Sequence, residues 1–364
     1  MTADLAVVGG GVIGAFAAYE AARQRPDWRV LLLERSAIGA GATAWSAGVS
    51  FPLGATPGHR ELARAAATAY AGLRDTPAGP FLRPVQMIYV LERGGLPGFR
   101  ERVVDADLRP VTVAERRRVT EILPGLRIGP ADEMVTHDGH GFAVQARPVA
   151  EALVAAVADR AEIQLGQHVD AIEPGADGYR LRTAHGEWPA RRVVLACGPW
   201  APPVVRTVPL PPAPGGRRKR IAALHARLPV DRGDPLVYFV DDDLFILPLA
   251  AGTALVSFYR DEWDTDPDTV DGRPSADDLR LGTAALARRS AVAAAAVVGG
   301  RAFCDLYTEH RLPVVTTDPA LPGLAAIRGG SGSGVRLAPG LAVQAVRAVL
   351  DAPAPVPELD LPIS

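Results

Sequence analysis

The stretch from Leu5 to Ser36 constrains the fold more than any other part of the 364-residue chain. It begins with a short apolar run, Leu5 to Val8, and continues with glycines at Gly9, Gly11 and Gly14. Between a strand and a helix, Gly9 allows a tight turn, Gly11 lets the backbone approach a pyrophosphate, and Gly14 lets the helix pack closely on the strand. The pattern therefore predicts a phosphate site at the N-terminal N–H groups of a helix.

A second strand and an acidic residue complete this unit. The helix ends before Pro26, and the run from Arg29 to Leu33 leads to Glu34. An acid about 20 residues after the last glycine accepts hydrogen bonds from the ribose hydroxyls of a dinucleotide. The order of strand, glycines, helix, strand and acid predicts a dinucleotide site, and an ordinary βαβ turn rich in glycine is the alternative. The stretch does not distinguish NAD from FAD.

Composition narrows the class of protein. Apolar residues make up 48% of the chain and charged residues 22%, as expected for a globular protein of two domains. The net charge of −2 gives no reason to expect nucleic acid or an acidic membrane as a partner, so we expect small molecules. No membrane span or signal segment is visible, which predicts a cytoplasmic protein. With only Cys197 and Cys304, neither a disulfide framework nor a cysteine metal site is expected.

Several further elements follow from hydrophobic periodicity and turn residues. Residues 39–54 are too rich in glycine for a stable helix and predict an ordered loop against a ligand. A linker at 208–220 precedes strands that predict an antiparallel sheet, and Ser275 with Asp278 predicts a capping box. The remaining elements expected in the first part of the chain are helices at 60–73 and 148–160, a strand at 85–93, short strands at 163–165 and 168–172, and a hairpin at 179–198 that returns to a parallel sheet.

The residues from Ile327 to Leu350 favour FAD over NAD. They predict a second strand, glycine-rich turn and helix near the opposite end of the sequence. One such turn is enough for a pyrophosphate. A second helix N-terminus is useful where a conjugated ring accumulates negative charge, because the positive end of the helix dipole stabilises a reduced, anionic flavin.

Four motifs together carry a family resemblance: "VVGGGVIG" with Glu34 and Arg35, "GAGATAWSAG", "VVLACGPW" and "GGSGSGVRLAP". With them the chain resembles the FAD-dependent amine and amino-acid oxidoreductases, which include D-amino-acid oxidase, glycine oxidase and monomeric sarcosine oxidase. The resemblance implies an α/β (α+β overall) fold with a Rossmann-like FAD-binding domain and a second, mainly antiparallel-sheet substrate domain. The implied division is 1–58, 140–207 and 305–364 for the FAD-binding domain, and 59–139 and 208–304 for the substrate domain.

The same resemblance implies which residues contact FAD. The adenosine lies at the N-terminal unit, the flavin lies under the C-terminal glycine turn, and the main chain at Val169 contacts adenine. The residues expected to bind the cofactor are Gly9, Gly11, Val12, Ile13, Gly14, Glu34, Arg35, Gly41, Ala42, Thr43, Ser46, Ala47, Gly48, Val169, Ala196, Gly198, Gly330, Ser331, Gly332, Ser333, Gly334 and Val335.

The implied reaction is hydride transfer to flavin from the carbon that bears the amine of an amino acid or related amine. Arg336 matches a basic residue that binds the substrate carboxylate in sarcosine oxidase-like members, and Arg311 is its rival; a surface salt bridge is the alternative for either. The electron acceptor, oxygen or another molecule, stays open because Val256 occupies the position of an oxygen-activating lysine. Alternative functions are a flavin dehydrogenase for 2-hydroxy acids and a non-catalytic flavin-binding subunit.

Other chemical candidates are interpreted as structural. Cys304 resembles a cysteine that links covalently to flavin, but its spacing differs by one residue, which favours a buried, inert thiol and releasable FAD. His137 and His140 predict a solvated turn and no metal site. The basic run Arg217 to Arg220 predicts a solvated strand start. Ser46 lacks the preceding strand of a hydrolase nucleophile.

Overall fold

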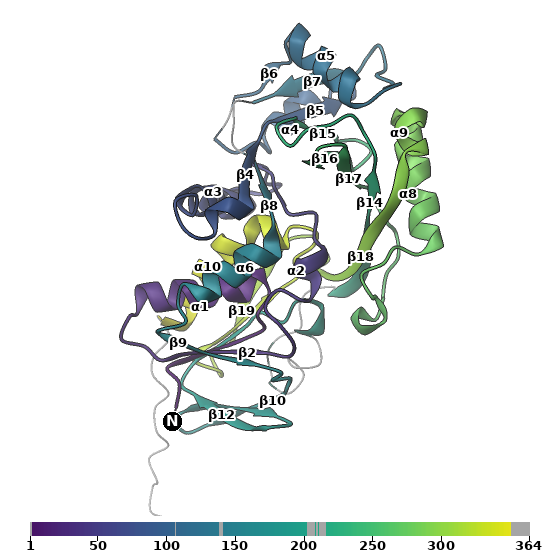
Figure 1. The fold of residues 1–364 in the computed structure, drawn as a ribbon. Coiled ribbons are helices and arrows are strands. Elements are labelled where there is room, and N and C mark those ends of the chain that lie inside the picture. The colour runs from purple at the N-terminus through teal and green to yellow at the C-terminus, as the bar shows by residue number, and fades with distance from the viewer. Residues whose placement is uncertain are drawn as a thin grey trace, which may run out of the picture.

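The computed structural model describes residues 2–105, 107–137, 141–201, 208, 210 and 216–350. Its first layer is a six-stranded sheet in the order β19-β20-β13-β1-β2-β9 (Figure 1). All neighbours in this sheet are parallel except β19, which is antiparallel to β20. The strands are β1 (Leu5–Val8), β2 (Val30–Glu34), β9 (Ala161–Leu165), β13 (Val193–Leu195), β19 (Val314–Thr317) and β20 (Leu324–Arg328).

Helices cover one face of this sheet and a small antiparallel sheet covers the other (Figure 1). The predicted N-terminal helix is α1 (Val12–Gln24), whose buried face is rich in alanine and so approaches its neighbours closely. Beside it lie α6 (Ala146–Ala155) and α10 (Gly334–Leu350), and α3 (Pro57–Gly72) packs on α10. The opposite face holds β10 (Val169–Gly175), β11 (Gly178–Thr183) and β12 (Gly186–Ala190).

A hydrogen bond between α3 and α10 compensates for a proline inside α10. Pro339 has no N–H group, so it cannot donate to the carbonyl of Val335 one turn earlier. The hydroxyl of the fully buried Tyr70 donates to that carbonyl at 2.6 Å. The first turn of α10 is therefore anchored to α3.

The second layer is an eight-stranded sheet in the order β18-β14-β17-β16-β15-β5-β7-β6. Every pairing is antiparallel except that of β15 with β5, which confirms the predicted mainly antiparallel sheet. The helices α5 (Val113–Ile122), α8 (Ala276–Arg289) and α9 (Ala291–Ala295) pack against it. Its strands are β5 (Met87–Leu91), β6 (Arg109–Pro110), β7 (Glu133–Thr136), β14 (Arg217–Ala226), β15 (Leu236–Phe239), β16 (Leu244–Ala250), β17 (Thr253–Ser257) and β18 (Val297–Tyr307).

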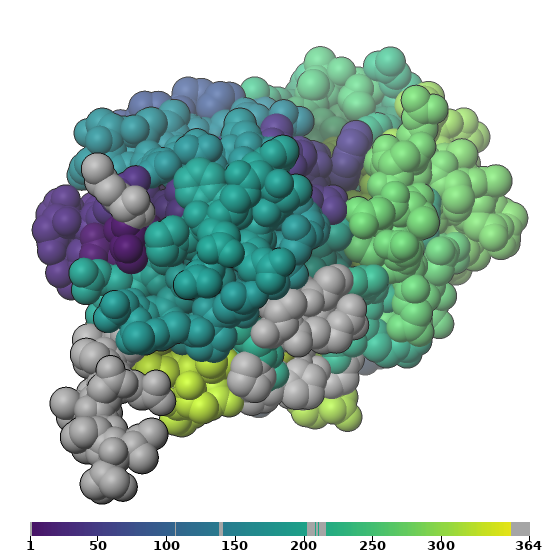
Figure 2. Space-filling model, turned by 90° about the horizontal axis from the view of Figure 1, so that it is seen from below, coloured from purple at the N-terminus to yellow at the C-terminus, as the bar shows by residue number. Residues whose placement is uncertain are grey.

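A three-stranded sheet, β3-β8-β4, connects the two layers. Seen from below, the teal residues of the β10–β12 region and the green residues near 270–300 lie on opposite sides of the molecule (Figure 2). The remaining elements are β3 (Val49–Ser50), β4 (Leu82–Val85), β8 (Gly141–Val144), α2 (Ala42–Trp45), α4 (Leu96–Arg100) and the 3₁₀ turns η1 (Gly79–Phe81), η2 (Gly198–Trp200) and η3 (Pro267–Thr269).

The elements differ from the sequence predictions in two places. The loop at 39–54 contains one helical turn, α2, flanked by its glycines, so the expectation of no helix there was wrong. The predicted strand at 85–93 corresponds to β5, but its first residue, Val85, ends the separate strand β4, which belongs to another sheet. The proposed domain boundary at residue 59 stays a prediction, and α3, which it places in the substrate domain, packs with α1 and α10.

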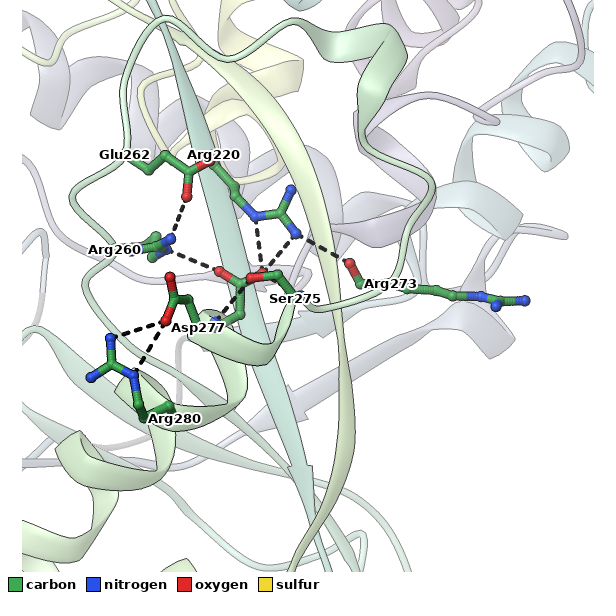
Figure 3. Close-up of polar contacts among 8 residues, drawn as sticks. Arg220, Arg260, Glu262, Arg273, Ser275, Asp277 and Arg280 are labelled. Atoms are coloured by element: carbon green, nitrogen blue, oxygen red, sulfur yellow. Dashed lines mark hydrogen bonds and ion pairs between the residues drawn. The ribbon is translucent and has the colours of Figure 1, made fainter.

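A buried carboxylate fixes α8 to the second sheet (Figure 3). Ser275 and Asp278 form the predicted capping box at the start of α8. Asp278 is fully buried, and one of its oxygens accepts from Nε and Nη2 of Arg220 on β14 at 2.9 and 2.7 Å. Its other oxygen accepts from Nε of Arg260 at 2.9 Å. Burial alone would raise the pKa of Asp278, but its hydrogen bonds with Arg220 and Ser275 hold that pKa below the usual value, so the network is charged and neutralised.

Candidate active site

A cavity of about 420 Å³ is lined by residues from both layers. It extends from the carboxyl ends of β1 and β2 to the inner face of the eight-stranded sheet. All residues predicted to contact the cofactor line it except Gly14, and Arg311 and Arg336 line it too. The structure thus gathers residues from both ends and the middle of the chain around one space.

The first glycine turn leaves its backbone open to the cavity. Gly9 has a φ of +101°, and a Cβ there would lie 2.6 Å from the carbonyl oxygen of Ala196. A Cβ at Gly11 would meet only Thr43 Oγ1, at 3.2 Å, and would otherwise point into open space. A Cβ at Gly14 would lie 1.8 Å from the Gly9 carbonyl oxygen, so Gly14 permits helix packing behind the cavity wall.

The N-terminus of α1 is free to receive an anion. The helix has no side-chain cap from Gly11 and no acidic residue in its first turn. Thr43, from the loop that contains α2, accepts a hydrogen bond from the Val12 N–H at 3.0 Å and fixes that loop beside the turn. The positive end of the helix dipole therefore lies at the cavity wall formed by Gly11, Val12 and Ile13.

Backbone groups position Glu34 at the end of β2. Its carboxylate accepts from the N–H of Gly10 at 2.6 Å and from the N–H of Ser36 at 2.8 Å. Beside it, the guanidinium of Arg35 lies 3.9 Å from the ring centroid of Trp200. Asp268 accepts a hydrogen bond from each of these two side chains. No local sequence signal marks this residue.

The second glycine turn, Gly329 to Ser333, is held by a half-buried carboxylate. Asp305 on β18 accepts from the N–H groups of Gly332 and Leu306, both at 2.8 Å. A Cβ at Gly330 would lie 2.9 Å from an oxygen of Asp305, so a side chain there would displace that carboxylate. Burial raises the pKa of Asp305 to about 6. Sequence reasoning missed this residue because a single acid between apolar neighbours matches no motif.

The site thus combines two open glycine turns, each leading into a helix N-terminus, with an acid beside the first. The family model described as FAD-dependent oxidoreductase matches residues 4–347. The chain belongs to this family. The family resemblance predicted from the sequence is confirmed, as are the fold and the dependence on FAD.

Solved structures of FAD-dependent oxidoreductases and related enzymes share this fold. The chain is similar to glycine oxidase from Geobacillus kaustophilus, with a TM-score of 0.77 and 23% identity over 95% of both chains. It is similar to iminodiacetate oxidase from Chelativorans sp. BNC1, with a TM-score of 0.75 and 22% identity over 97% of both chains. L-proline dehydrogenase from P. horikoshii has a TM-score of 0.78 and 15% identity over 96% of this chain and 93% of its own. No curated protein sequence matches the chain.

The two arginines predicted to bind the substrate carboxylate in this oxidoreductase differ in how far they are buried. Arg336, in the first turn of α10, is half-buried; it donates to Ser333 Oγ at 2.5 Å and to the Leu53 carbonyl oxygen at 3.3 Å. Its Nη2 also lies 3.3 Å from Nε2 of His59. Arg311 is exposed, in the turn after β18, with a φ of +54°. The structure places both at the cavity, and their roles stay predictions.

The basic run Arg217 to Arg220 does begin a strand, β14, and Arg217 is exposed, but the prediction of a solvated run was wrong for Lys219 and Arg220, which are buried. Lys219 is 2% exposed and lines the cavity, whereas Arg220 points to the opposite side of β14 and binds Asp278. The alternation of side chains along a strand separates the two neighbours. The Lys219 ammonium lies 3.8, 4.9 and 5.1 Å from the ring centroids of Tyr259, Trp263 and Tyr307. Sequence reasoning missed this cage because its rings come from separate segments.

The other residues considered in the sequence either do not line the cavity or lie outside the described residues. Cys304 is buried, is not among the described residues that line the cavity, and contacts the carbonyl oxygen of Thr265 at 3.7 Å; releasable FAD stays a prediction. Val256 is fully buried on β17. The expectation that His137 is solvated was wrong, because it is fully buried and lies 3.1 Å from the Tyr89 hydroxyl. His140 lies outside the described residues.

The residues that the structure describes contain neither a metal-site cluster nor a membrane-spanning helix. No cluster of three or more histidine, cysteine, aspartate or glutamate side chains has the arrangement of a metal site. No described helix combines the length and apolar character needed to cross a bilayer.

Proposed function

We propose that this FAD-dependent oxidoreductase oxidises the C–N bond of an amino acid or a related amine. The C–H bond next to the amine breaks and its hydrogen leaves with the electron pair, which FAD accepts when bound. The nitrogen lone pair forms the C=N bond, and water then hydrolyses the imine. The glycine turns Gly9–Gly14 and Gly329–Gly334 would hold FAD, with Glu34 toward its ribose.

The observation that carries the proposal is Arg336. Among the described residues its guanidinium has only neutral partners: Ser333, Leu53 and His59. Burial and Arg102 lower the pKa of Arg336 to about 10, so it is still charged at pH 7. A cation with no carboxylate partner beside the second glycine turn fits the carboxylate of a substrate, which it can bind through two parallel hydrogen bonds.

The neighbouring side chains orient the substrate and exclude water. His59 is 7% exposed, and burial with the charge of Arg336 lowers its pKa to about 4, so it is neutral at pH 7 and does not compete for a carboxylate. The rings of Phe51, Tyr238 and Phe245 pack together at the cavity, with centroids 5.3 to 6.2 Å apart. This geometry can position the reacting C–H bond without supplying an acid or base.

Three alternatives stay open to experiment. A 2-hydroxy acid also carries a carboxylate, and a non-catalytic flavin subunit would bind FAD without turnover. The acceptor that reoxidises the flavin can be oxygen or another molecule. We also propose a cytoplasmic location, supported by the two cysteines, which are both free thiols in the structure.

Anaerobic flavin reduction tests the proposal. The purified holoenzyme is mixed with amino acids and with 2-hydroxy acids of the same carbon skeleton, and the absorbance of the oxidised flavin is followed. We expect bleaching by amino acids or N-alkyl amino acids and none by hydroxy acids. Bleaching by hydroxy acids alone, or by neither class, would contradict the proposal. Reoxidation of the reduced enzyme by air or by an artificial dye then distinguishes an oxidase from a dehydrogenase.

A further inference from the structure

Seven cationic side chains of the described residues line the cavity, among them Arg35, Arg260 and Arg328. The other four are Arg102, Lys219, Arg311 and Arg336. Within the part of the chain that the structure describes, none of the four forms an ion pair with a carboxylate. Arg220 and Arg260, by contrast, share Asp278. The cavity therefore concentrates positive charge that no ion pair with a described carboxylate neutralises directly.

The four cations form two like-charged pairs. Arg102 lies close enough to Arg336 to lower its pKa, and both lower the pKa of His59. Arg311 likewise lowers the pKa of Lys219, which burial brings to about 8. The guanidinium of Arg311 lies 5.7 Å from the centroid of the Tyr259 ring, and the Lys219 ammonium lies 3.8 Å from the same centroid. The two cations of each pair repel each other until an anion binds between or beside them.

The nearby carboxylates of the described residues form no ion pair with either pair, although the charges of Asp243 and Asp261 partly offset the lowering of the Lys219 pKa. Asp305 is hydrogen-bonded to the backbone of the second glycine turn. Asp243 accepts from the Tyr238 hydroxyl at 3.3 Å. Asp261 accepts from Trp263 at 2.7 Å and from the Tyr259 hydroxyl at 3.1 Å. In the proposed binding mode the diphosphate of FAD lies at the first glycine turn, so the cofactor does not supply the missing anions.

We infer that the substrate is an amino acid with a second anionic group. The carboxylate next to the amine binds Arg336, and the second carboxylate binds Arg311, with Lys219 reinforcing the positive potential behind it. The rings of Phe51, Tyr238 and Phe245 face the carbon chain between the two charges. A monocarboxylic substrate would leave one like-charged pair without an anion. This inference rests on the proposed function.

Isosteric acid and amide pairs provide the test. Aspartate is compared with asparagine, and glutamate with glutamine, as both enantiomers, in anaerobic reduction of the holoenzyme flavin. Each pair has the same shape and differs only in the second charge. We expect the acid of at least one pair to reduce the flavin with a kcat/KM at least about tenfold higher than its amide.

Inert ligands test the same site without turnover. Succinate and glutarate are titrated against their half-amides, succinamate and glutaramate, and binding is measured by calorimetry and by perturbation of the flavin spectrum. We expect at least about tenfold tighter binding of the dicarboxylate. Arg311→Gln should reduce that ratio to about threefold or less, and Lys219→Met should reduce it partly. Arg280→Gln removes an exposed cation that does not line the cavity and should leave the ratio unchanged.

The two readouts separate two kinds of failure. Reduction of the flavin by amides as readily as by acids, with equal binding of both ligand types, would overturn the inference and leave the proposed function standing. Preferential binding of dicarboxylates without reduction by any amino acid would contradict the proposed function and support the dianion site. FAD content and thermal stability are checked for every variant, and the wild-type ratios decide the matter if a variant does not fold.

Discussion

The two ends of the cavity accommodate negative charge in different ways. At the first glycine turn the groups that face the cavity are backbone N–H groups and the end of α1, and the one nearby arginine, Arg35, is paired with Asp268. At the second turn the groups are formal charges on Arg102, Lys219, Arg311 and Arg336, none paired with a described carboxylate.

The difference has an energetic consequence. Helix N-terminal N–H groups are partial charges that remain exposed in any helix, so directing them at a ligand adds little cost to folding. Lys219 and the half-buried Arg336 lose hydration, and the like-charged side chains at this end repel one another, which destabilises the folded protein until a ligand binds. We therefore expect changes at the first end to remove the cofactor, and changes at the second end to remove activity without lowering stability.

The largest effect is expected from Gly11→Val. A branched side chain would occupy the open space beside the backbone that the pyrophosphate needs, so the variant should purify without FAD. Gly58→Val is the matched control, because a Cβ at Gly58 meets nothing within 4 Å and that residue does not line the cavity. The ratio of flavin to protein absorbance measures FAD content, and full occupancy in Gly11→Val would refute the placement of the cofactor.

Asp278→Ala should destabilise the protein by about 3–5 kcal/mol, because it leaves Arg220 and Arg260 without their shared anion. Asp277→Ala removes a neighbouring exposed acid that pairs with Arg280 (Figure 3), and it should cost less than about 1 kcal/mol. Chemical denaturation of both variants measures the contrast. Similar losses in the two would show that the buried network is not what fixes α8.

Arg336→Leu should reduce kcat/KM for carboxylated amines at least about a hundredfold, equal to roughly 3 kcal/mol of transition-state stabilisation. Amines without a carboxylate should lose much less, and FAD content should be unchanged. The melting temperature should not fall, because the variant removes an unneutralised charge. Equal losses for both amine classes would indicate that Arg336 supports the flavin, and Arg311 would become the preferred clamp.

The smallest effect concerns pH and Lys219. Its folded pKa of about 8 lies below the usual value, so between about pH 8 and 10 the unfolded chain binds more protons and stability should rise with pH. Arg311, Asp243 and Asp261 are the charged groups that influence Lys219, and Tyr259 and Tyr307 stay neutral because their own pKa values are raised. Relative to Lys219→Met, the wild type should gain on the order of 1 kcal/mol over this range. Parallel stability profiles of the two proteins would contradict the lowered pKa.

The same contrast explains which parts were predictable from the sequence. The first turn depends on glycines and an acid at fixed spacing, because backbone geometry dictates them, and all but Gly14 line the cavity. The cage around Lys219 depends on rings from β18 and from the segment after β17, which only the folded sheet brings together. No local sequence pattern marks Asp305, Asp268 or Arg102 either, because their contacts also form only in the folded chain. Periodicity could not reveal that Lys219 and Arg220 face different environments, because charged residues near a strand start usually face solvent.

The bond from Tyr70 to the Val335 carbonyl has a consequence for how tightly a substrate can be held. Val335 directly precedes Arg336, and His59, on the same helix as Tyr70, contacts the Arg336 guanidinium. Helix α3 therefore immobilises both the backbone and the tip of one long side chain before any ligand arrives. The rotational freedom that an arginine normally gives up at binding is lost already during folding, so more of the interaction with a carboxylate remains as affinity.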